Sequence, residues 1–189
     1  MTRRLLGLLG IIGGFALLSA WIVTIPTSDL LNLRLVLFTA GSMAIILVVA
    51  RPDPRSGLSA IVLASGVALV ANAAYLLMIL MTVARPGDLR PTDFPPGFPI
   101  AGLALWSSDA AFGLAAFRVA GVNRAGALAL GVGSLLAVTG IDRLGLTSAA
   151  NPTIFVELSQ VGLVLNGLGW VVIGFDVLLK APPRRAEAR

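Results

Sequence analysis

The sequence predicts an all-α membrane protein, a polytopic bundle of six transmembrane helices with both chain ends in the cytoplasm. Three observations support this fold class. Hydrophobic residues make up 57% of the chain and charged residues 12%, the apolar residues form six long runs, and basic residues gather at alternate ends of those runs. A soluble domain carries about a quarter of its residues as charged side chains. Because a backbone in lipid must satisfy its own hydrogen bonds, the runs should be helices.

The first three runs are each long enough to cross a bilayer once. The first covers residues 5–25 and stops before Pro26, which cannot continue a helix. The second covers 28–50, beginning in the cap-like sequence Thr27-Ser28-Asp29, and the third covers 58–84. Crossing about 30 Å of hydrocarbon takes about 20 residues, with a range of about 17 to 25.

A proline-rich loop, 85–99, separates these runs from the last three. The fourth run covers 100–117 and the fifth, which is the shortest, covers 125–141. The sixth covers 153–180 and follows Asn151-Pro152, where Asn can cap the helix and Pro takes an early helical position.

The basic residues predict the orientation of the bundle. With six crossings and a cytoplasmic N-terminus, ten of the 14 basic residues lie in inner segments and four in outer ones. Short cytoplasmic loops retain Lys and Arg, whereas translocated loops are depleted of them. We therefore expect a bacterial inner (plasma) membrane protein with both termini cytoplasmic. Residues 1–180 should form a single transmembrane domain, and 181–189 a disordered cytoplasmic tail.

The first run has an alternative interpretation. Arg3-Arg4 followed by an apolar stretch also resembles the start of a secretory signal peptide. The stretch is longer than a usual signal core, and no clear A-x-A cleavage site follows it. Cleavage would leave five spans and would still place the C-terminus inside.

Missing residue types exclude several classes of chemistry. The chain contains no Cys and no His, which excludes disulfides, zinc sites built from these residues, His-ligated haem and His-based catalytic triads. It also lacks the common nucleotide-binding and hydrolase motifs. We expect no cofactor and no metal site. The net charge of +5 arises from residues at the ends of apolar runs, so nucleic acid is not an expected partner.

Two stripes of small residues are candidates for helix–helix contacts. Lipid supplies no hydrophobic force between helices, so close packing depends on small side chains. The first run has Gly7, Gly10 and Gly14, with Gly13 beside them. The stripe of the fourth run consists of Ala101, Ala104, Ser108, Ala111 and Ala115. The alternative is that Ala and Gly are simply common in transmembrane segments.

Polar residues at mid-membrane depth define the candidate site. An ionisable side chain in a bilayer is costly, so it faces the bundle interior, a partner or water. Asp109 lies halfway along the fourth run, Asn72 near the middle of the third and Asn166 near the middle of the sixth, with Tyr75 one turn from Asn72. One hypothesis is a site in which Asp109 binds a cation or carries a proton. The other is that a neutral Asp109 donates a hydrogen bond to Asn72 or Asn166 and fixes helix register.

Ion pairs are expected near both ends of the spans. Arg34 and Glu157 lie at similar depth near the outer ends of the second and sixth runs and could pair. The alternative is that each side chain extends independently to the headgroups. Asp176 and Lys180 are four residues apart near the inner end of the sixth run, a spacing that favours a pair on a helix.

Internal repetition is slight, because only Gly41-Ser42 and Gly133-Ser134 echo one another. Chance explains this echo adequately. Two other stretches resemble uncharacterised bacterial multi-pass membrane proteins: Phe117 to Arg124 with the following run to Gly140-Ile141-Asp142, and Leu165 to Trp170. The resemblance covers about the last third of the chain, and it implies a membrane location and a helical fold.

The sequence leaves three functional hypotheses. The first is a small transporter or channel-like protein that uses Asp109 at the midplane, with a homodimer as one arrangement. The second is a non-catalytic accessory or scaffold protein that binds a membrane partner through its small-residue faces. The third is an intramembrane enzyme acting on lipid, for which no nucleophile–base pair is visible; we therefore expect a non-enzyme. Membrane lipids are expected contacts in every case.

Overall fold

The computed structural model of the chain describes residues 3–22, 28–50, 60–83, 97–139 and 153–180. These residues form six α-helices and no β-strand. The helices are α1 (Arg3–Ile22), α2 (Ser28–Val49), α3 (Ala60–Val83), α4 (Phe98–Ala116), α5 (Arg124–Val138) and α6 (Thr153–Leu179). Each expected run overlaps one helix, which confirms the helical fold class. The expected tail, 181–189, lies outside the described residues.

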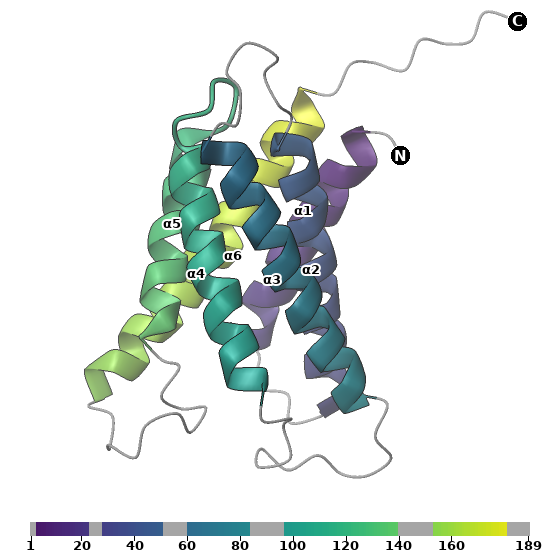
Figure 1. Cartoon of the computed structure of the whole chain (residues 1–189), viewed down its shortest axis with the longest axis vertical. Helices are drawn as coiled ribbons and strands as arrows, with labels where there is room; N and C mark the ends of the chain where they lie inside the picture. The colour runs from purple at the N-terminus through teal and green to yellow at the C-terminus, as the bar shows by residue number, and fades with distance from the viewer. Residues whose placement is uncertain (1–2, 23–27, 51–59, 84–96, 140–152, 181–189) are drawn as a thin grey trace, which may run out of the picture.

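The six helices form a closed ring in chain order. Each helix packs mainly against its neighbours in sequence, and α6 closes the ring by packing against α1. The helices run along one long axis, and α1 begins at the same end of the bundle at which α6 ends (Figure 1). We call this the terminal end. Successive helices therefore run up and down, so residues at mid-helix from all six can share one level.

Glycine contacts hold α1 between α2 and α6. A Cβ atom on Gly13 would lie 2.9 Å from the Cα of Gly41 on α2, and one on Gly14 would lie 2.7 Å from the carbonyl oxygen of Gly167 on α6. Only glycine allows backbones to approach so closely. The glycine stripe predicted on the first helix is thus a contact surface, and both of its partners are other helices of the same bundle.

The stripe predicted on the fourth helix is only partly buried. Ala101 and Ser108 are buried, but Ala104 and Ala111 are exposed. The buried face of α4 is centred instead on Leu105, Asp109, Phe112 and Ala116. Ala104 and Ala111 are therefore not buried between helices of the bundle, whose interior on this side is filled by large side chains.

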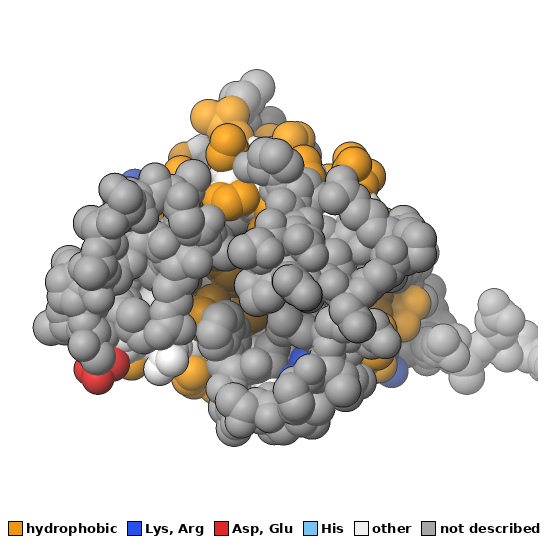
Figure 2. Space-filling view, turned by 90° about the horizontal axis from the view of Figure 1, so that it is seen from below, with side chains coloured by type: hydrophobic (Ala, Val, Ile, Leu, Met, Phe, Trp, Pro, Cys, Tyr) orange, Lys and Arg blue, Asp and Glu red, His pale blue; other side chains and the backbone are white. Residues whose placement is uncertain are grey.

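The outer surface of the bundle is apolar on every helix. Three described helices are long and apolar enough to cross a membrane, covering Ala60–Met81, Phe98–Ala116 and Glu157–Leu179. Shorter apolar helices cover Leu33–Val49 and Arg124–Val138. Viewed from the end opposite the terminal end, the described side chains that are visible are mainly hydrophobic (Figure 2). Large exposed apolar residues include Phe15, Leu47, Val70, Ile100, Leu135 and Val161, one from each helix.

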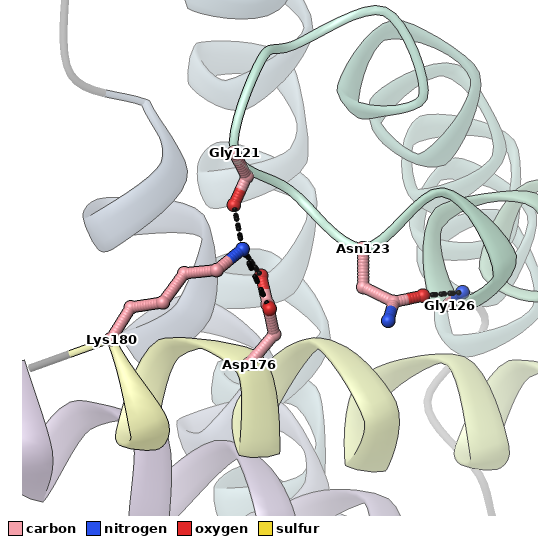
Figure 3. Close-up of polar contacts among 5 residues, drawn as sticks. All are labelled: Gly121, Asn123, Gly126, Asp176 and Lys180. Carbon is pink, nitrogen blue, oxygen red and sulfur yellow. Dashed lines mark hydrogen bonds and ion pairs between the residues drawn. The ribbon is translucent and has the colours of Figure 1, made fainter.

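The turn between α4 and α5 is anchored to the end of α6 (Figure 3). The Lys180 ammonium donates to the Gly121 carbonyl oxygen at 2.7 Å and pairs with the Asp176 carboxylate at 2.7 Å. The Asn123 side chain caps α5 by accepting a hydrogen bond from the Gly126 N–H at 3.0 Å. Gly121 has a φ of 86°, which glycine adopts without steric cost. The predicted pairing of Asp176 with Lys180 is confirmed.

Candidate functional site

A layer of buried polar side chains crosses the middle of the bundle. It contains Ser42 on α2, Asn72 on α3, Asp109 on α4, Ser134 on α5 and Asn166 on α6, each at most 1% exposed. Asp109 is the only fully buried side chain among the Asp, Glu, Lys and Arg residues whose side-chain exposure the structure describes. Buried polar groups in an apolar interior are costly unless they are hydrogen-bonded. The partners of these five side chains therefore define what the layer can do.

Three of the five form one continuous hydrogen-bonded chain. The Ser42 hydroxyl donates to the amide oxygen of Asn72, and the Asn72 amide nitrogen donates to Oδ1 of Asp109 at 3.1 Å. The same amide nitrogen donates to the Ala68 carbonyl oxygen at 2.9 Å. Both amide hydrogens and the amide oxygen of Asn72 are thus engaged. This side chain joins α2, α3 and α4 and presents a donor to the Asp109 carboxyl group.

The other two form a separate pair. The Asn166 amide nitrogen donates to the Ser134 hydroxyl oxygen at 2.6 Å, and that hydroxyl donates to the Leu130 carbonyl oxygen at 2.8 Å. The backbones of α5 and α6 meet at the same place, since a Cβ atom on Gly133 would lie 2.4 Å from the backbone nitrogen of Asn166. Asn166 therefore joins α6 to α5, and its side-chain amide bonds to Ser134 rather than to Asp109.

Glycine contacts with α1 bring the two groups to a common level. Gly41, which precedes Ser42, lies against Gly13, and Gly167, which follows Asn166, lies against Gly14. Since Gly13 and Gly14 are adjacent, Ser42 and Asn166 lie at nearly the same height along the bundle axis. The polar layer is thus one level shared by the whole ring.

Three polar atoms in and next to this layer have no hydrogen-bond partner among the described residues. They are Oδ2 of Asp109, Oδ1 of Asn166 and Nε1 of Trp170. The first two are acceptors and the third is a donor. A buried polar atom without a partner costs about 1 to 3 kcal/mol, and such atoms in native proteins often mark a role other than folding. The carboxyl oxygen of Asp109 that has no hydrogen-bond partner could accept a proton or contact a cation.

Two aromatic pairs enclose Asp109 along the bundle axis. On α4, Trp106 lies three residues before Asp109 and stacks on Phe38 of α2, with ring centroids 5.7 Å apart. Phe112 lies three residues after it and stacks on Trp170 of α6, also at 5.7 Å. The two aromatic pairs extend across the bundle, the first from α4 to α2 and the second from α4 to α6. They fill the space on both sides of the carboxyl group with apolar material.

The remaining candidates lie away from this chain of hydrogen bonds. Tyr75 is 6% exposed, and its ring packs against Phe98 with centroids 5.1 Å apart, toward the end opposite the terminal end. Arg34 donates to the Ser19 carbonyl oxygen on α1 at 3.2 Å, and the Glu157 side chain is exposed. No ion pair joins Arg34 and Glu157, both of which the structure describes. Arg34 instead reaches the backbone of α1, the helix that packs against both α2 and α6.

Ser42 and Ser134 are the site residues that sequence reasoning missed. A serine in an apolar run is common, and its hydroxyl can bond to its own helix backbone, so neither residue stands out alone. The echo of Gly41-Ser42 in Gly133-Ser134, which chance also explains, is the sequence signal that contains both serines. Each of these serines bonds to an asparagine on the following helix.

Comparison of the chain with protein-family models, with curated proteins and with solved structures finds no match.

Proposed function

We propose that the chain is a multi-pass protein of a bacterial inner membrane that crosses the bilayer six times with both termini in the cytoplasm. Support comes from the exposed apolar side chains on all six helices, which water would disfavour as a continuous surface. Five described basic residues lie at the terminal end: Arg3, Arg4, Arg118, Arg124 and Lys180. Such an excess of basic residues is typical of a cytoplasmic end, which supports the proposed orientation. The 15-residue helix α5 rises only about 22 Å, which is less than the hydrocarbon thickness of about 30 Å. It packs between α4 and α6.

We further propose that the protein is a small transporter or channel-like protein that binds a proton or a small cation at Asp109. One observation carries this proposal. A fully buried carboxyl group has one oxygen held by Asn72 and the other without a partner in the described residues. An acid at membrane depth that served only to join helices would be expected to use both oxygens. The second oxygen is therefore available to bind a proton or a small cation.

The relation between the two halves of the chain also supports transport. Each half has a Gly-Ser pair on its second helix, and the serine of that pair bonds to an asparagine on the third helix of the same half. Since three helices per half reverse the chain direction, the halves lie inverted with respect to each other. Transporters built from inverted repeats bind their solutes near the midplane, at the interface of the repeats. Asp109 of the second half bonds to Asn72 of the first half at this interface.

The alternative is an accessory or scaffold protein that binds a membrane partner through small-residue faces. The glycine stripe of α1 is unsuitable for this role because it is buried against α2 and α6. The exposed alanines of α4, Ala104 and Ala111, are the described small residues that could serve it. This alternative predicts that substitutions of Asp109 leave all activities of the protein unchanged.

The experiment is cation flux in proteoliposomes. Purified protein is reconstituted, and the decay of imposed proton, Na⁺ or K⁺ gradients is followed with entrapped dyes. We expect the wild type to dissipate at least one gradient and Asp109→Asn to lose most of that flux, because the variant removes the ionisable group that binds the ion. Glu157→Gln, which neutralises an exposed carboxylate on α6, should retain it.

The stability of the same variants separates a functional role from a structural one. Asp109→Asn keeps an oxygen that can accept from Asn72, so we expect it to unfold in detergent at nearly the wild-type temperature. A loss of about 1 kcal/mol or more in both Asp109→Asn and Asp109→Ala, with flux through Asp109→Asn intact or no flux in the wild type, would show that Asp109 is a structural group. The site would then be abandoned in favour of the accessory role.

A further inference from the structure

An open groove runs along the outside of the bundle between α3 and α4. Its volume is about 940 Å³, and its lining is almost entirely apolar. Short side chains form its floor, among them Gly66 on α3 and Ala104, Ser107 and Ala111 on α4. A Cβ atom added to Gly66 would meet no atom within 4 Å. The longer side chain of Val70, which is 72% exposed, stands at its edge. The surface is therefore a trough rather than a ridge.

The groove continues to the terminal end of the bundle, where it meets a basic residue. A second hollow of about 370 Å³ is lined by the first residues of α3, Ala60 and Ile61, and by Ala115 and Arg118 near the end of α4. The two hollows adjoin on both helices, because Ile61 of the second precedes Val62 of the first on α3, and Leu114 of the second lies three residues after Ala111 of the first on α4. Together they extend from residue 60 to 74 on α3 and from 104 to 119 on α4. This α3–α4 groove rises about 21 Å along α3. One leaflet of a bilayer supplies about 15 Å of hydrocarbon, half of about 30 Å.

Arg118 gives the groove a charged mouth. The side chain is exposed, and no carboxylate of the described residues pairs with it. Of the described acidic residues, Asp176 is the one near this end, and it is paired with Lys180. The end as a whole is basic. An occupant of the groove therefore meets a long apolar trough and, at its mouth, a guanidinium group that favours phosphate.

A second copy of the chain fits this surface poorly. In a two-fold dimer the same patch faces itself. Trough would then face trough, which encloses a void, and two Arg118 side chains would lie at the same depth with like charge. An acyl chain fills a trough of this shape, and an anionic headgroup neutralises Arg118.

We propose that the α3–α4 groove is a binding site for an anionic phospholipid of the cytoplasmic leaflet. Its phosphate contacts Arg118, and one acyl chain lies over Gly66 between the two helices. The proposal requires the bundle to lie in a membrane, as proposed above, but it does not involve Asp109. Asp109→Asn should therefore bind the lipid as the wild type does, so the two proposals can fail separately.

The test is lipid binding to the full-length purified chain in detergent. Native mass spectrometry and thermal unfolding are measured with phosphatidylglycerol, with phosphatidylcholine and with inorganic phosphate. We expect one phosphatidylglycerol to be retained and to raise the unfolding temperature, with phosphatidylcholine bound more weakly. Arg118→Gln should weaken phosphatidylglycerol binding about fivefold, as expected for one basic residue at a membrane surface. Gly66→Leu should weaken it by blocking the trough.

Matched variants separate this site from general charge and from general surface effects. Arg4→Gln removes an exposed basic residue at the same end but on α1, and Ala40→Leu enlarges an exposed small residue on α2. Both should bind phosphatidylglycerol within about twofold of the wild type, since neither lies in the groove. Equal binding of the two lipids, equal losses in Arg118→Gln and Arg4→Gln, or equal stabilisation by inorganic phosphate alone would overturn the proposal. A lipid-free dimer that Gly66→Leu dissociates would also overturn it.

Discussion

At the scale of single residues, Asn72 has the most demanding position in the polar layer. All of its amide hydrogen-bonding groups are engaged, with Ser42, Ala68 and Asp109 as partners on three helices. A side chain with both hydrogens and its oxygen committed cannot rotate without breaking several bonds at once. Asn72 therefore holds the Asp109 carboxyl group in one orientation and leaves its second oxygen pointing away from that donor.

Replacing Asn72 by Ala should lower the free energy of unfolding by about 1 to 3 kcal/mol. The variant loses its bonds to Ser42 and Asp109 and leaves both groups buried without these partners. The measurement is unfolding in detergent micelles by heat or by SDS. Ser107→Ala is the control, because Ser107 is an exposed hydroxyl at a similar height on α4 and its loss should change stability by less than about 0.5 kcal/mol. Equal stability of Asn72→Ala and the wild type would show that the layer does not hold these helices together.

At the scale of helices, glycine contacts determine how closely neighbours approach. The carbonyl oxygen of Gly167 and the Val171 side chain both lie 2.7 Å from the position of a Cβ atom on Gly14. By contrast, Gly66 lies on the open floor of the α3–α4 groove. Two glycines in long apolar helices thus have opposite surroundings, and the same substitution tests both.

Gly14→Ala should destabilise the bundle by about 1 to 3 kcal/mol, the usual cost of overpacking, because α1 must move away from α6. Gly66→Ala should leave stability unchanged or raise it slightly, since Ala favours a helix and meets nothing there. Both variants are compared with the wild type by unfolding in the same detergent. If the order of the two variants were reversed, the packing of α1 between α2 and α6 would be incorrect.

The existence of the six helices could be predicted from the sequence, but not which face of each helix is buried. Hydropathy, Pro26 and the Asn151-Pro152 start place the runs, because lipid selects long apolar segments. α4 begins at Phe98 rather than at Ile100 because Pro99 is tolerated in a first turn, where no N–H bond is needed. The sequence does not reveal the buried face of a helix, because a side chain that faces lipid is as apolar as one that faces the core. Ala104 and Ala111 belong to the stripe predicted for helix–helix contacts, yet both are exposed.

The candidate site was partly predictable for a related reason. A lone acid such as Asp109 in an apolar run stands out because ionisable residues are rare there. Asn72 was one of the two partners that the sequence suggested for Asp109, but the predicted donor was wrong, because Asn72 donates and Asp109 accepts. The pairing of Asn166 with Ser134, and the stacked rings on each side of Asp109, depend on how far neighbouring helices are rotated. That rotation has no counterpart in a hydropathy pattern.

At the scale of the whole molecule, the closed ring places the proposed cytoplasmic surface at the terminal end. Because the chain contains no Cys, single cysteines can report each end without background. We expect Glu157→Cys to react with a membrane-impermeant maleimide on intact cells. Ala120→Cys, in the exposed turn between α4 and α5, should react only after the cells are permeabilised. The opposite pattern would invert the proposed orientation, and labelling of both on intact cells would contradict a single orientation.

The stacked rings beside Asp109 have an optical consequence. The chain has three tryptophans, and two of them, Trp106 and Trp170, belong to the aromatic pairs that flank the carboxyl group. Indole emission responds to nearby charge and polarity. With Trp21 replaced by Phe, the tryptophan fluorescence of the protein would come entirely from the two sides of the polar layer. The molecule therefore carries its own spectroscopic probe, and ions can be screened against Asp109 without any label.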